Sequence, residues 1–446
     1  MHSSLYRCLI LLFCLMAGCA INQGDFQNYQ PDTQSSNQDE QICSQMTDLN
    51  NEIEKPNYVI LTRAMFAERL MDFVTEHSEK YTIKILVADD FVQNNTSLDV
   101  AEQIRTRLGM EYEVDSENYL LIVGAPDTEK QNELCHSLDH AWEIPTRYVP
   151  FLGEDTQPIL DKNFIPTDQY YASVNERWDT GEFEWMKRFT FSADYLVGRV
   201  PVKTVEELGA WTQKNKDYRT PEAPRHSIFT NDACTQPNAK FPQDFLNGFL
   251  SQYTHSMSFH RCVGDDGGNI SDFGNADQAD FISVYSHGNS QAVVAGKKGY
   301  SLLAESADFE KPPIIFAHAC DTAAPDLEEG SLGTNLIRMP NGALAYVGYT
   351  RSNTSIIHPF WEQVFLDDGL TLGKAVYASK QKLFSHKLPK PDEINDWFAL
   401  TLFGDPSIRL TEPRQTLELG AQTLQGSEPI TVCADIATGA DSGNAE

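Results

Sequence analysis

The sequence predicts an α/β fold with a mostly parallel sheet flanked by helices, and the prediction rests on strand-like runs that alternate with helical spacing. Three short runs of apolar and β-branched residues, Tyr58–Leu61, Ile83–Val87 and Tyr119–Gly124, are typical of buried strands. The segments between them, Ala64–Glu76 and Leu98–Leu108, have the spacing of amphipathic helices. This alternation favours parallel strands with helices on both faces of the sheet.

The same pattern continues in the second half of the chain. Apolar runs at Phe281–Ser286, Pro313–Cys320 and Gly342–Gly348 predict three further strands, and Pro359–Asp367 and Thr371–His386 predict helices. The stretch between the first two runs is long enough for a crossover with a helical turn or two, which favours a parallel pair.

The remaining segments are less regular. We expect irregular structure over residues 125–195, where prolines recur, and over residues 221–270. Asp194–Val202 is strand-like, but Pro201 favours an edge or a strand end over a central strand. Thr204 and Glu207 predict a capping box at the start of a helix. The residues after 410 predict one or two strands followed by a frayed end.

The N-terminus has the pattern of an export signal. Arg7 precedes ten apolar or small residues, Cys8–Ala17, and Gly18–Cys19 follow. Such a run is too short to span a bilayer, which needs about 20 residues. Leu15–Cys19 resembles a bacterial lipobox, in which cleavage leaves the cysteine to carry a lipid. We therefore expect export to the bacterial cell envelope and a membrane anchor at Cys19; ordinary secretion is the alternative.

These patterns divide the chain into five parts. We expect a signal peptide over residues 1–18 and a flexible, lipid-anchored tether over residues 19–56, which is rich in Asn, Gln, Asp and Ser. An N-terminal α/β subdomain follows over residues 57–220 and a catalytic α/β subdomain over residues 221–410. Residues 411–446 form a C-terminal tail.

Composition argues against some partners. The formal net charge is -30, from 34 basic and 64 acidic residues, so nucleic acid and anionic lipid surfaces are not expected as main partners. Solubility is the favoured explanation of the acidic excess, and recognition of basic substrates is the alternative. Export permits disulfides, and Cys234 with Cys262 is the first candidate pair.

Cys320 and His287 are the candidate catalytic residues, because each lies at the end of an apolar run predicted to form a strand. Residues just past the ends of parallel strands emerge at one edge of the sheet, where open α/β sheets keep their reactive groups. An imidazole can accept the thiol proton or stabilise the thiolate, which makes the sulfur a nucleophile. The pair therefore predicts a cysteine peptidase.

Other residues compete for roles at this site. His318 lies two residues before Cys320 and is a second candidate base. Ser286 and Ser331 are weaker candidate nucleophiles, since neither lies in a Gly-x-Ser-x-Gly motif. Asp168 and Asp194 are candidates for an acid that orients the imidazole, although loop capping also explains them.

Substrate preference and metal binding are less strongly indicated. Asp326, Glu328 and Glu329 follow Cys320 and either attract a basic substrate side chain or form a solvated loop. Asp179–Glu182 and Asp265–Asn269 are oxygen-rich turns without the spacing of an EF-hand. Cys135, His136 and His140 lack a fourth zinc ligand. We therefore expect no cofactor and no metal at the site, and leave structural calcium as an alternative.

The chain resembles the gingipain family of secreted bacterial cysteine peptidases, whose clan also contains caspases and legumains. The segments that carry the resemblance occur in order within residues 57–410: Pro166–Ala172, Val197–Val202, Ser286–Gly288, His318–Cys320 and Leu402–Ser407. The resemblance implies a caspase-like α/β fold in two subdomains, with His287 and Cys320 as a dyad. It also implies an oxyanion hole formed by the N–H groups of Gly288 and Cys320. A large propeptide and a C-terminal immunoglobulin-like module, common in that family, are not expected here.

These observations together predict an exported, lipid-anchored cysteine endopeptidase that cleaves proteins or peptides through a thioester acyl-enzyme. One alternative is a non-catalytic envelope lipoprotein that binds a partner in the same crevice. Another is a cysteine transpeptidase or acyltransferase, in which an amine replaces water as the acceptor.

Overall fold

The computed structural model describes most of the chain between residues 55 and 409 and two short strands beyond it. The described ranges are 55–94, 96–126, 137–153, 164–178, 189–218, 226–231, 256–261, 279–295, 300–304, 307–352, 370–383, 390–409, 418–420 and 433–435. The chain divides into a large unit, Lys55–Pro413, and a small unit made of Met1–Glu54 and Arg414–Glu446. In the small unit, β16 (Glu418–Gly420) and β17 (Cys433–Asp435) pair antiparallel. This pair agrees with the strands expected after residue 410.

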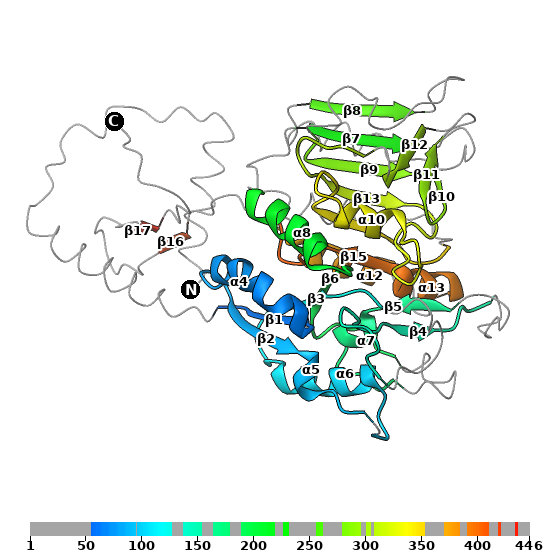
Figure 1. Ribbon diagram of the computed structural model, residues 1–446. Coiled ribbons are helices and arrows are strands. Elements are labelled where there is room, and N and C mark those ends of the chain that lie inside the picture. Colours follow the sequence, from blue (N-terminus) through cyan, green and yellow to red (C-terminus); the bar gives the residue numbers. More distant parts are fainter. Residues whose placement is uncertain are drawn as a thin grey trace, which may run out of the picture. The chain divides into compact units, whose positions relative to one another are not determined.

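The large unit is built on a sheet of ten strands in the order β2-β1-β3-β6-β15-β14-β13-β9-β7-β8 (Figure 1). The first four strands of this order are parallel to one another, and so are the last five. β15 pairs with β14 in the antiparallel sense and meets β6 at one residue pair, Phe403 with Arg199. The mostly parallel sheet expected from the sequence is confirmed, and it continues across the subdomain boundary expected near residue 220.

The strands of this sheet are four to six residues long. Their bounds are β1 Asn57–Thr62, β2 Thr82–Val87, β3 Asn118–Val123, β6 Leu196–Val200, β7 His226–Asn231, β8 Ser256–Arg261, β9 Phe281–Tyr285, β13 Ile314–His318, β14 Ala345–Tyr349 and β15 Leu400–Phe403. Two small antiparallel sheets accompany it: β4 Arg147–Val149 with β5 Ile165–Thr167, and β10 His287–Gly288 with β11 Ala292–Ala295 and β12 Tyr300–Leu303.

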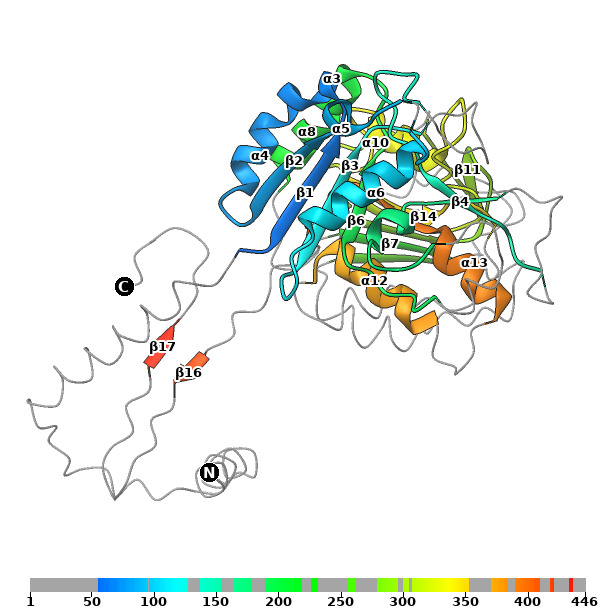
Figure 2. The same cartoon turned by 90° about the horizontal axis from the view of Figure 1, so that it is seen from below.

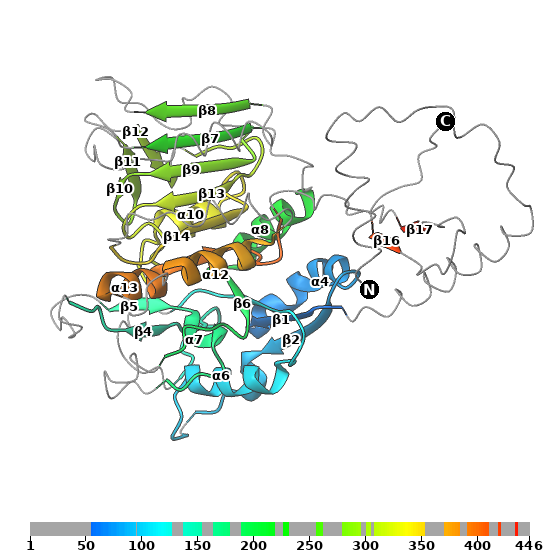
Figure 3. The same cartoon turned by 180° about the vertical axis from the view of Figure 1, so that it is seen from behind.

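Helices cover both faces of the sheet, because successive residues of a strand point to opposite sides. In β1, Tyr58 and Ile60 share a core cluster with residues of α4 (Met71–His77), α8 (Val205–Asp217) and α10 (Leu332–Arg338). Val59 and Leu61 share another with α6 (Val100–Glu111) and α7 (Gln169–Ala172). Phe316 of β13 shares a third with α12 (Leu372–Leu383) and α13 (Pro391–Ala399). Figures 1 and 3 show α8 and α10 on one side of the sheet and α12 and α13 on the other. The result is a layer of strands between two layers of helices.

The helices are mostly short. Their bounds are α3 Ala64–Ala67, α4 Met71–His77, α5 Ala88–Phe91, α6 Val100–Glu111, α7 Gln169–Ala172, α8 Val205–Asp217, α10 Leu332–Arg338, α12 Leu372–Leu383 and α13 Pro391–Ala399, with a 3-10 turn at Glu68–Leu70. The helix expected over Ala64–Glu76 is therefore divided into α3, the 3-10 turn and α4. The predicted capping box is confirmed, since the N–H of Glu207 donates to Thr204 and the N–H of Thr204 donates to Glu207, both at 3.2 Å. No helix within the described ranges has the length and apolar character needed to cross a bilayer.

Several expectations for the connecting segments are wrong. β6 lies inside the sheet, so an edge position is wrong, whereas the expected strand end at Pro201 is confirmed: Pro201 follows β6 directly, where its missing N–H removes no ladder bond. The crossover between β9 and β13 carries the strands β10, β11 and β12, which were not expected there. Strands also occur in both stretches expected to be irregular, namely β4 and β5 in the first and β7 and β8 in the second. The helix expected over Pro359–Asp367 lies outside the described residues.

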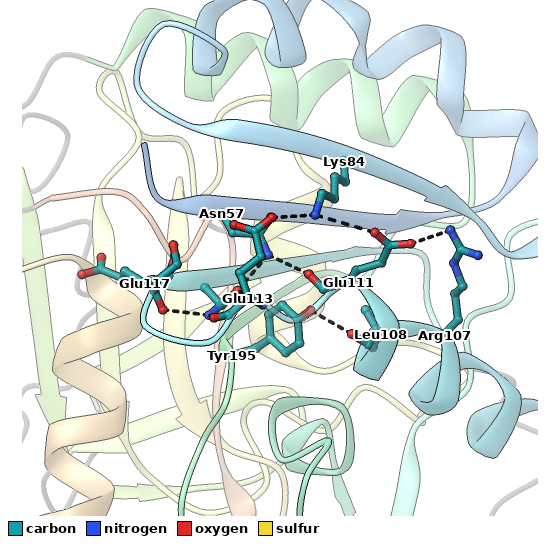
Figure 4. Close-up of polar contacts among 10 residues, drawn as sticks. Asn57, Lys84, Arg107, Leu108, Glu111, Glu113, Glu117 and Tyr195 are labelled. Carbon is teal, nitrogen blue, oxygen red and sulfur yellow. Dashed lines mark hydrogen bonds and ion pairs between the residues drawn. The ribbon is translucent and has the colours of Figure 1, made fainter. Parts of the chain in front are cut away.

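Polar contacts fix the ends of β1, β2 and α6 to one another (Figure 4). The side-chain amide of Asn57 donates to the carbonyl oxygen of Glu111 at 3.0 Å, which anchors the last turn of α6 to the start of β1. The ammonium of Lys84, on β2, lies 2.7 Å from a carboxylate oxygen of Glu113 and 3.7 Å from one of Glu111. Figure 2, seen from below, shows α6 lying along β1. These contacts stabilise the end of the sheet at which β1 begins.

Candidate active site

β9, β13 and β14 are neighbouring parallel strands that end at the same edge of the sheet. Ser286 and His287 follow β9, Ala319 and Cys320 follow β13, and Thr350 and Arg351 follow β14. In open α/β sheets, the segments that follow parallel strands line the crevice where ligands bind. This edge is therefore the part of the fold in which reactive side chains can gather.

His287 and Cys320 leave adjacent strands at the same level. Tyr285 pairs with His318 in the register of β9 and β13, and the N–H of Ser286 donates to the carbonyl oxygen of His318 at 3.1 Å. The side chain of His287 is exposed, and Cys320 is half-buried and carries a thiol rather than half of a disulfide. The structure thus brings the two segments that bear these residues side by side.

Gly288 lies against the turn that contains Cys320. A Cβ atom added to this glycine would be 2.7 Å from the Cβ of Ala319, 2.9 Å from the carbonyl oxygen of Cys320 and 2.9 Å from a methyl group of Thr322. Real Cβ atoms do not approach other heavy atoms so closely, so position 288 has room for glycine alone. The backbone at residue 288 is therefore in direct contact with the segment that carries the thiol.

The turn after β13, residues 320–324, has an unusual backbone conformation and is called the Cys320 turn below. Asp321 has a φ of 60°, in the left-handed region that residues other than glycine rarely adopt. Its N–H donates to the carbonyl oxygen of Arg351 at 3.4 Å, and the N–H of Ala323 donates to that of Tyr349 at 3.0 Å. Burial raises the pKa of the Asp321 carboxyl group, an effect that Arg351 opposes. The Cys320 turn is thus held against the end of β14.

A buried ion pair lies behind this turn. Arg351 donates two parallel hydrogen bonds to Asp326, from Nη1 to Oδ1 at 3.0 Å and from Nη2 to Oδ2 at 2.6 Å. The hydroxyl of Tyr148, on β4, donates to the same carboxylate at 3.2 Å. The carboxylate of Asp326 is thereby neutralised and fully buried, so the structure supports neither alternative for this residue, attraction of a basic substrate side chain or a solvated loop. Glu328 and Glu329 are exposed, as a solvated loop requires.

The sequence profile of peptidase family C25 matches residues 51–411 of this chain. The chain belongs to peptidase family C25. This assignment makes it a gingipain-like cysteine peptidase, whose substrates are proteins or peptides. The resemblance inferred from the five ordered segments is confirmed.

Solved structures with the same fold agree with the family assignment. The crystal structure of the Arg-specific cysteine proteinase gingipain R (RgpB) is 14% identical in sequence, with a TM-score of 0.59, over 83% of this chain and 82% of that chain. The complex of the pro- and mature domains of Porphyromonas gingivalis RgpB is 16% identical, with a TM-score of 0.59, over 82% of each chain. A search of the curated proteins found no match. The caspase-like α/β fold expected from the sequence is confirmed.

In this C25 peptidase, three other candidate residues for the site make packing or capping contacts that give each of them a structural role. His318 is 3% exposed, and its ring centroid lies 5.2 Å from that of Tyr349. Ser331 is the N-cap of α10 and accepts from the N–H of Thr334 at 3.4 Å. Asp194 accepts hydrogen bonds from the N–H and the side-chain amide of Asn175, each at 2.8 Å, as expected of a loop cap.

Asp168 forms a buried ion pair with Arg199. Arg199 donates from Nε at 2.7 Å and from Nη2 at 2.6 Å to the two carboxylate oxygens of Asp168, and Arg199 itself is fully buried. The remaining donors of Arg199 bind the carbonyl oxygens of Gly124, Ile144 and Pro145. Both members of the pair lie in segments that carry the family resemblance. A structural role in joining these segments explains Asp168 without an orienting function.

A cavity of about 680 Å³ lies away from the candidate site, beside Asp405. Asp405 follows β15, which is antiparallel to β14, so it lies at the opposite edge from Cys320. Its carboxylate accepts from Ser407 Oγ at 2.8 Å and lies 2.9 Å from His77 Nε2. Since the serine hydroxyl and the imidazole both contact the carboxylate rather than each other, this group lacks the order of a serine protease triad.

Other sequence-based expectations fall outside the described residues. These are Cys19, the proposed Cys234–Cys262 pair, the oxygen-rich turns Asp179–Glu182 and Asp265–Asn269, and His136 of the weak zinc pattern. Within the described part of the chain, no group of three or more His, Cys, Asp or Glu side chains is arranged to hold a metal ion.

The contacts made by Arg351 and Tyr148 were not among the expected features of the site. Tyr148 contacts Asp326 across 178 residues of sequence, and Arg351 does so across 25. No local pattern marks such partners. The acid-rich segment after Cys320 was a signal that a charge lay near the thiol, but its counter-charge came from the end of another strand.

Proposed function

We propose that this chain is an exported, lipid-anchored cysteine endopeptidase in which Cys320 is the nucleophile and His287 the base. The observation that carries the proposal is the contact between the backbone of residues 286–288 and that of residues 318–322. Membership of family C25 supports the activity. The contact supports the roles proposed for Cys320 and His287, because these residues follow two strands that end at the same edge of the sheet.

The proposed reaction is acyl transfer through a thioester. His287 takes the proton of the Cys320 thiol, and the sulfur attacks the carbonyl carbon of the scissile peptide bond. The N–H groups of Gly288 and Cys320 stabilise the negative oxygen of the tetrahedral intermediate. When the C–N bond breaks, the leaving amine takes the proton from His287, and water then hydrolyses the thioester with His287 again as the base. Cys320 and His287 carry this chemistry without a cofactor.

Active-site labelling tests the nucleophile. A thiol-directed peptidyl inhibitor should modify folded protein at Cys320, as located by mass spectrometry, and should abolish peptide hydrolysis. Cys320→Ala and His287→Ala should each lose nearly all turnover and keep the wild-type circular dichroism spectrum. Cys433→Ala, which replaces a cysteine of the small unit, is the matched control and should keep wild-type turnover. Turnover retained by Cys320→Ala would show that Cys320 is not the nucleophile.

The anchor at Cys19 is a separate part of the proposal, supported by Arg7, the apolar run Cys8–Ala17 and the Gly18–Cys19 pair. In a bacterial host, wild-type protein should partition with membranes and incorporate radiolabelled fatty acid. Cys19→Ser should lose the label. Cys14→Ser, which changes a cysteine inside the apolar run, should keep it. A Cys19→Ser protein that still incorporates fatty acid would contradict the anchor.

A further inference from the structure

The Asp326–Arg351 ion pair, together with Tyr148, connects three segments, one of which carries the candidate nucleophile. Asp326 belongs to the loop that follows Cys320, Arg351 follows β14, and Tyr148 lies on β4. The side chains of Asp326 and Arg351 are 0% and 11% exposed. A bidentate guanidinium–carboxylate pair is directional, so it fixes the orientation of both groups as well as their separation.

Arg351 also binds its own strand end. Its Nη1 donates to the carbonyl oxygen of Thr350 at 2.7 Å in addition to Asp326. The guanidinium therefore links the backbone at the end of β14 to the carboxylate of Asp326. Burial raises the pKa of the Tyr148 hydroxyl, and the nearby Asp326 raises it further, so Tyr148 stays protonated and donates to the carboxylate. The carboxylate has no freedom to turn toward solvent.

Backbone hydrogen bonds connect the end of β14, where Arg351 lies, to the turn that contains Cys320. The carbonyl oxygen of Arg351 accepts from the N–H of Asp321, the residue after Cys320, at 3.4 Å. On the other side of the Cys320 turn, the carbonyl oxygen of Thr322 accepts from the N–H of Gly333 in α10 at 2.8 Å. The turn is thus held between the end of β14 and α10.

The conformation of the Cys320 turn is one that needs such support. Asp321 has a positive φ of 60°, and residues other than glycine keep a sparsely populated conformation only where the surrounding structure holds them in it. If the contacts from Arg351 were lost, the turn would relax toward an ordinary backbone conformation. Such relaxation would move Cys320, since it lies directly before Asp321.

We propose that Asp326 and Arg351 are positioning residues, whose ion pair holds the Cys320 turn so that the thiol stays beside His287. This inference rests on the proposed role of Cys320 as the nucleophile. Neither residue acts on the substrate. Their effect is on the geometry of the nucleophile and base.

The charges of the pair make the test decisive. Asp326→Asn leaves the positive charge of Arg351 near the Cys320 turn, and by electrostatics alone a positive charge favours the thiolate. If the pair positions the thiol, loss of the proposed pairing with His287 should instead raise the pH at which Cys320 reacts. The two effects have opposite signs, so the direction of the shift separates them.

The experiment compares three variants of the mature protein. Asp326→Asn should lower kcat by roughly 10- to 100-fold, the range expected when a reacting group is misplaced by about 1 Å, with KM nearly unchanged. The pH midpoint for alkylation of Cys320 by iodoacetamide should rise toward about 8.5, the value of an ordinary thiol. Asp326→Leu with Arg351→Met removes both charges and replaces them by apolar side chains, which is often neutral for stability. This double variant should fold with a wild-type Tm and still show the loss of kcat and the raised midpoint.

Asp405→Asn is the matched control, because Asp405 is an equally buried carboxylate at the opposite edge of the sheet. It should change Tm but leave kcat and the alkylation midpoint at wild-type values. Wild-type kcat in a folded double variant, or a midpoint that stays or falls, would overturn the positioning role. Failure of the proposed nucleophile has a different signature, namely retained turnover in Cys320→Ala.

Discussion

The backbone at Gly288 approaches Cys320 so closely that a Cβ atom added to the glycine would lie 2.9 Å from the carbonyl oxygen of Cys320. The two residues are separated by the whole crossover between β9 and β13, yet they are in contact in the folded chain. Any side chain at position 288 must therefore displace either β10 or the Cys320 turn.

Gly288→Ala is expected to reduce peptide hydrolysis by about 100-fold or more, because the added methyl group must push the Cys320 turn away from the His287 segment. The measurement is kcat/KM on a peptide substrate, together with Tm. Gly109→Ala is a suitable control. Its nearest neighbour would be the Cβ of Val174 at 4.0 Å, so the methyl group fits and activity should not change. Full activity in Gly288→Ala would show that the two segments can separate without consequence.

Arg199→Met is expected to lower the free energy of unfolding by about 3–5 kcal/mol, because it leaves the buried carboxylate of Asp168 without its counter-charge. Arg199→Lys should recover little of the loss, since lysine cannot make the forked contact of a guanidinium. Urea denaturation measures both. The control is Lys84→Met, whose ion pairs are partly exposed and should contribute less than about 1 kcal/mol. Equal losses at the two sites would contradict the role of burial.

Asp405 is expected to stabilise the protein at neutral pH and to lose this effect in acid. Burial alone would raise the pKa of Asp405, but the hydrogen bond and charge of His77 and the contacts from Ser407 outweigh it and leave the pKa below its usual value. A carboxyl group with a lowered pKa stabilises the folded state above its unfolded pKa, and the effect disappears as pH falls through the folded pKa. The Tm difference between wild type and Asp405→Asn should therefore be constant from pH 7 to pH 5 and shrink toward pH 3. A difference that grows in acid would contradict this account.

Lys380→Met is expected to stabilise the protein more at pH 6 than at pH 9. Burial lowers the pKa of Lys380 to about 7, from an ordinary value of 10.5, so the unfolded chain binds more protons than the folded one between these two values. Wild-type stability therefore rises with pH over this interval, and methionine removes a charge-burial penalty of about 1–3 kcal/mol that is largest below pH 7.

Thermal unfolding at the two pH values measures the difference. Lys382→Met is the control on the same helix, since Lys382 is exposed and should show no such pH dependence. A stabilisation by Lys380→Met that is equal at both pH values would mean that the buried amine is not the group that titrates.

The strands of the first half could be predicted because local sequence determines them. Tyr58–Leu61, Ile83–Val87 and Tyr119–Gly124 are dominated by apolar and β-branched residues, and the observed strands differ from them by one residue or so at each end. The positions of His287 and Cys320 at strand ends followed from the same signal. Their meeting at one sheet edge then followed from the parallel direction of β9 and β13.

Long-range pairing could not be predicted in the same way. β15 has a partner on each side, β6 and β14, that is distant in sequence, and no turn signal connects it to either of them. The ion pair of Asp326 with Arg351 was equally hidden, because an acidic residue in a loop has the same local pattern whether it is solvated or buried. Pro201 was misleading for a related reason: it marks where β6 ends, but not which strands lie beside it.

The place of β15 in the sheet has a consequence for how the enzyme is made. Residues 400–403 lie between β6 and β14, so the two groups of parallel strands are joined only after nearly the whole chain has been synthesised. A nascent chain that emerges N-terminus first presents His287 and Cys320 long before this joining strand. The complete sheet, and with it proteolytic competence, is therefore expected to form only late in biosynthesis, once residues 400–403 have been made.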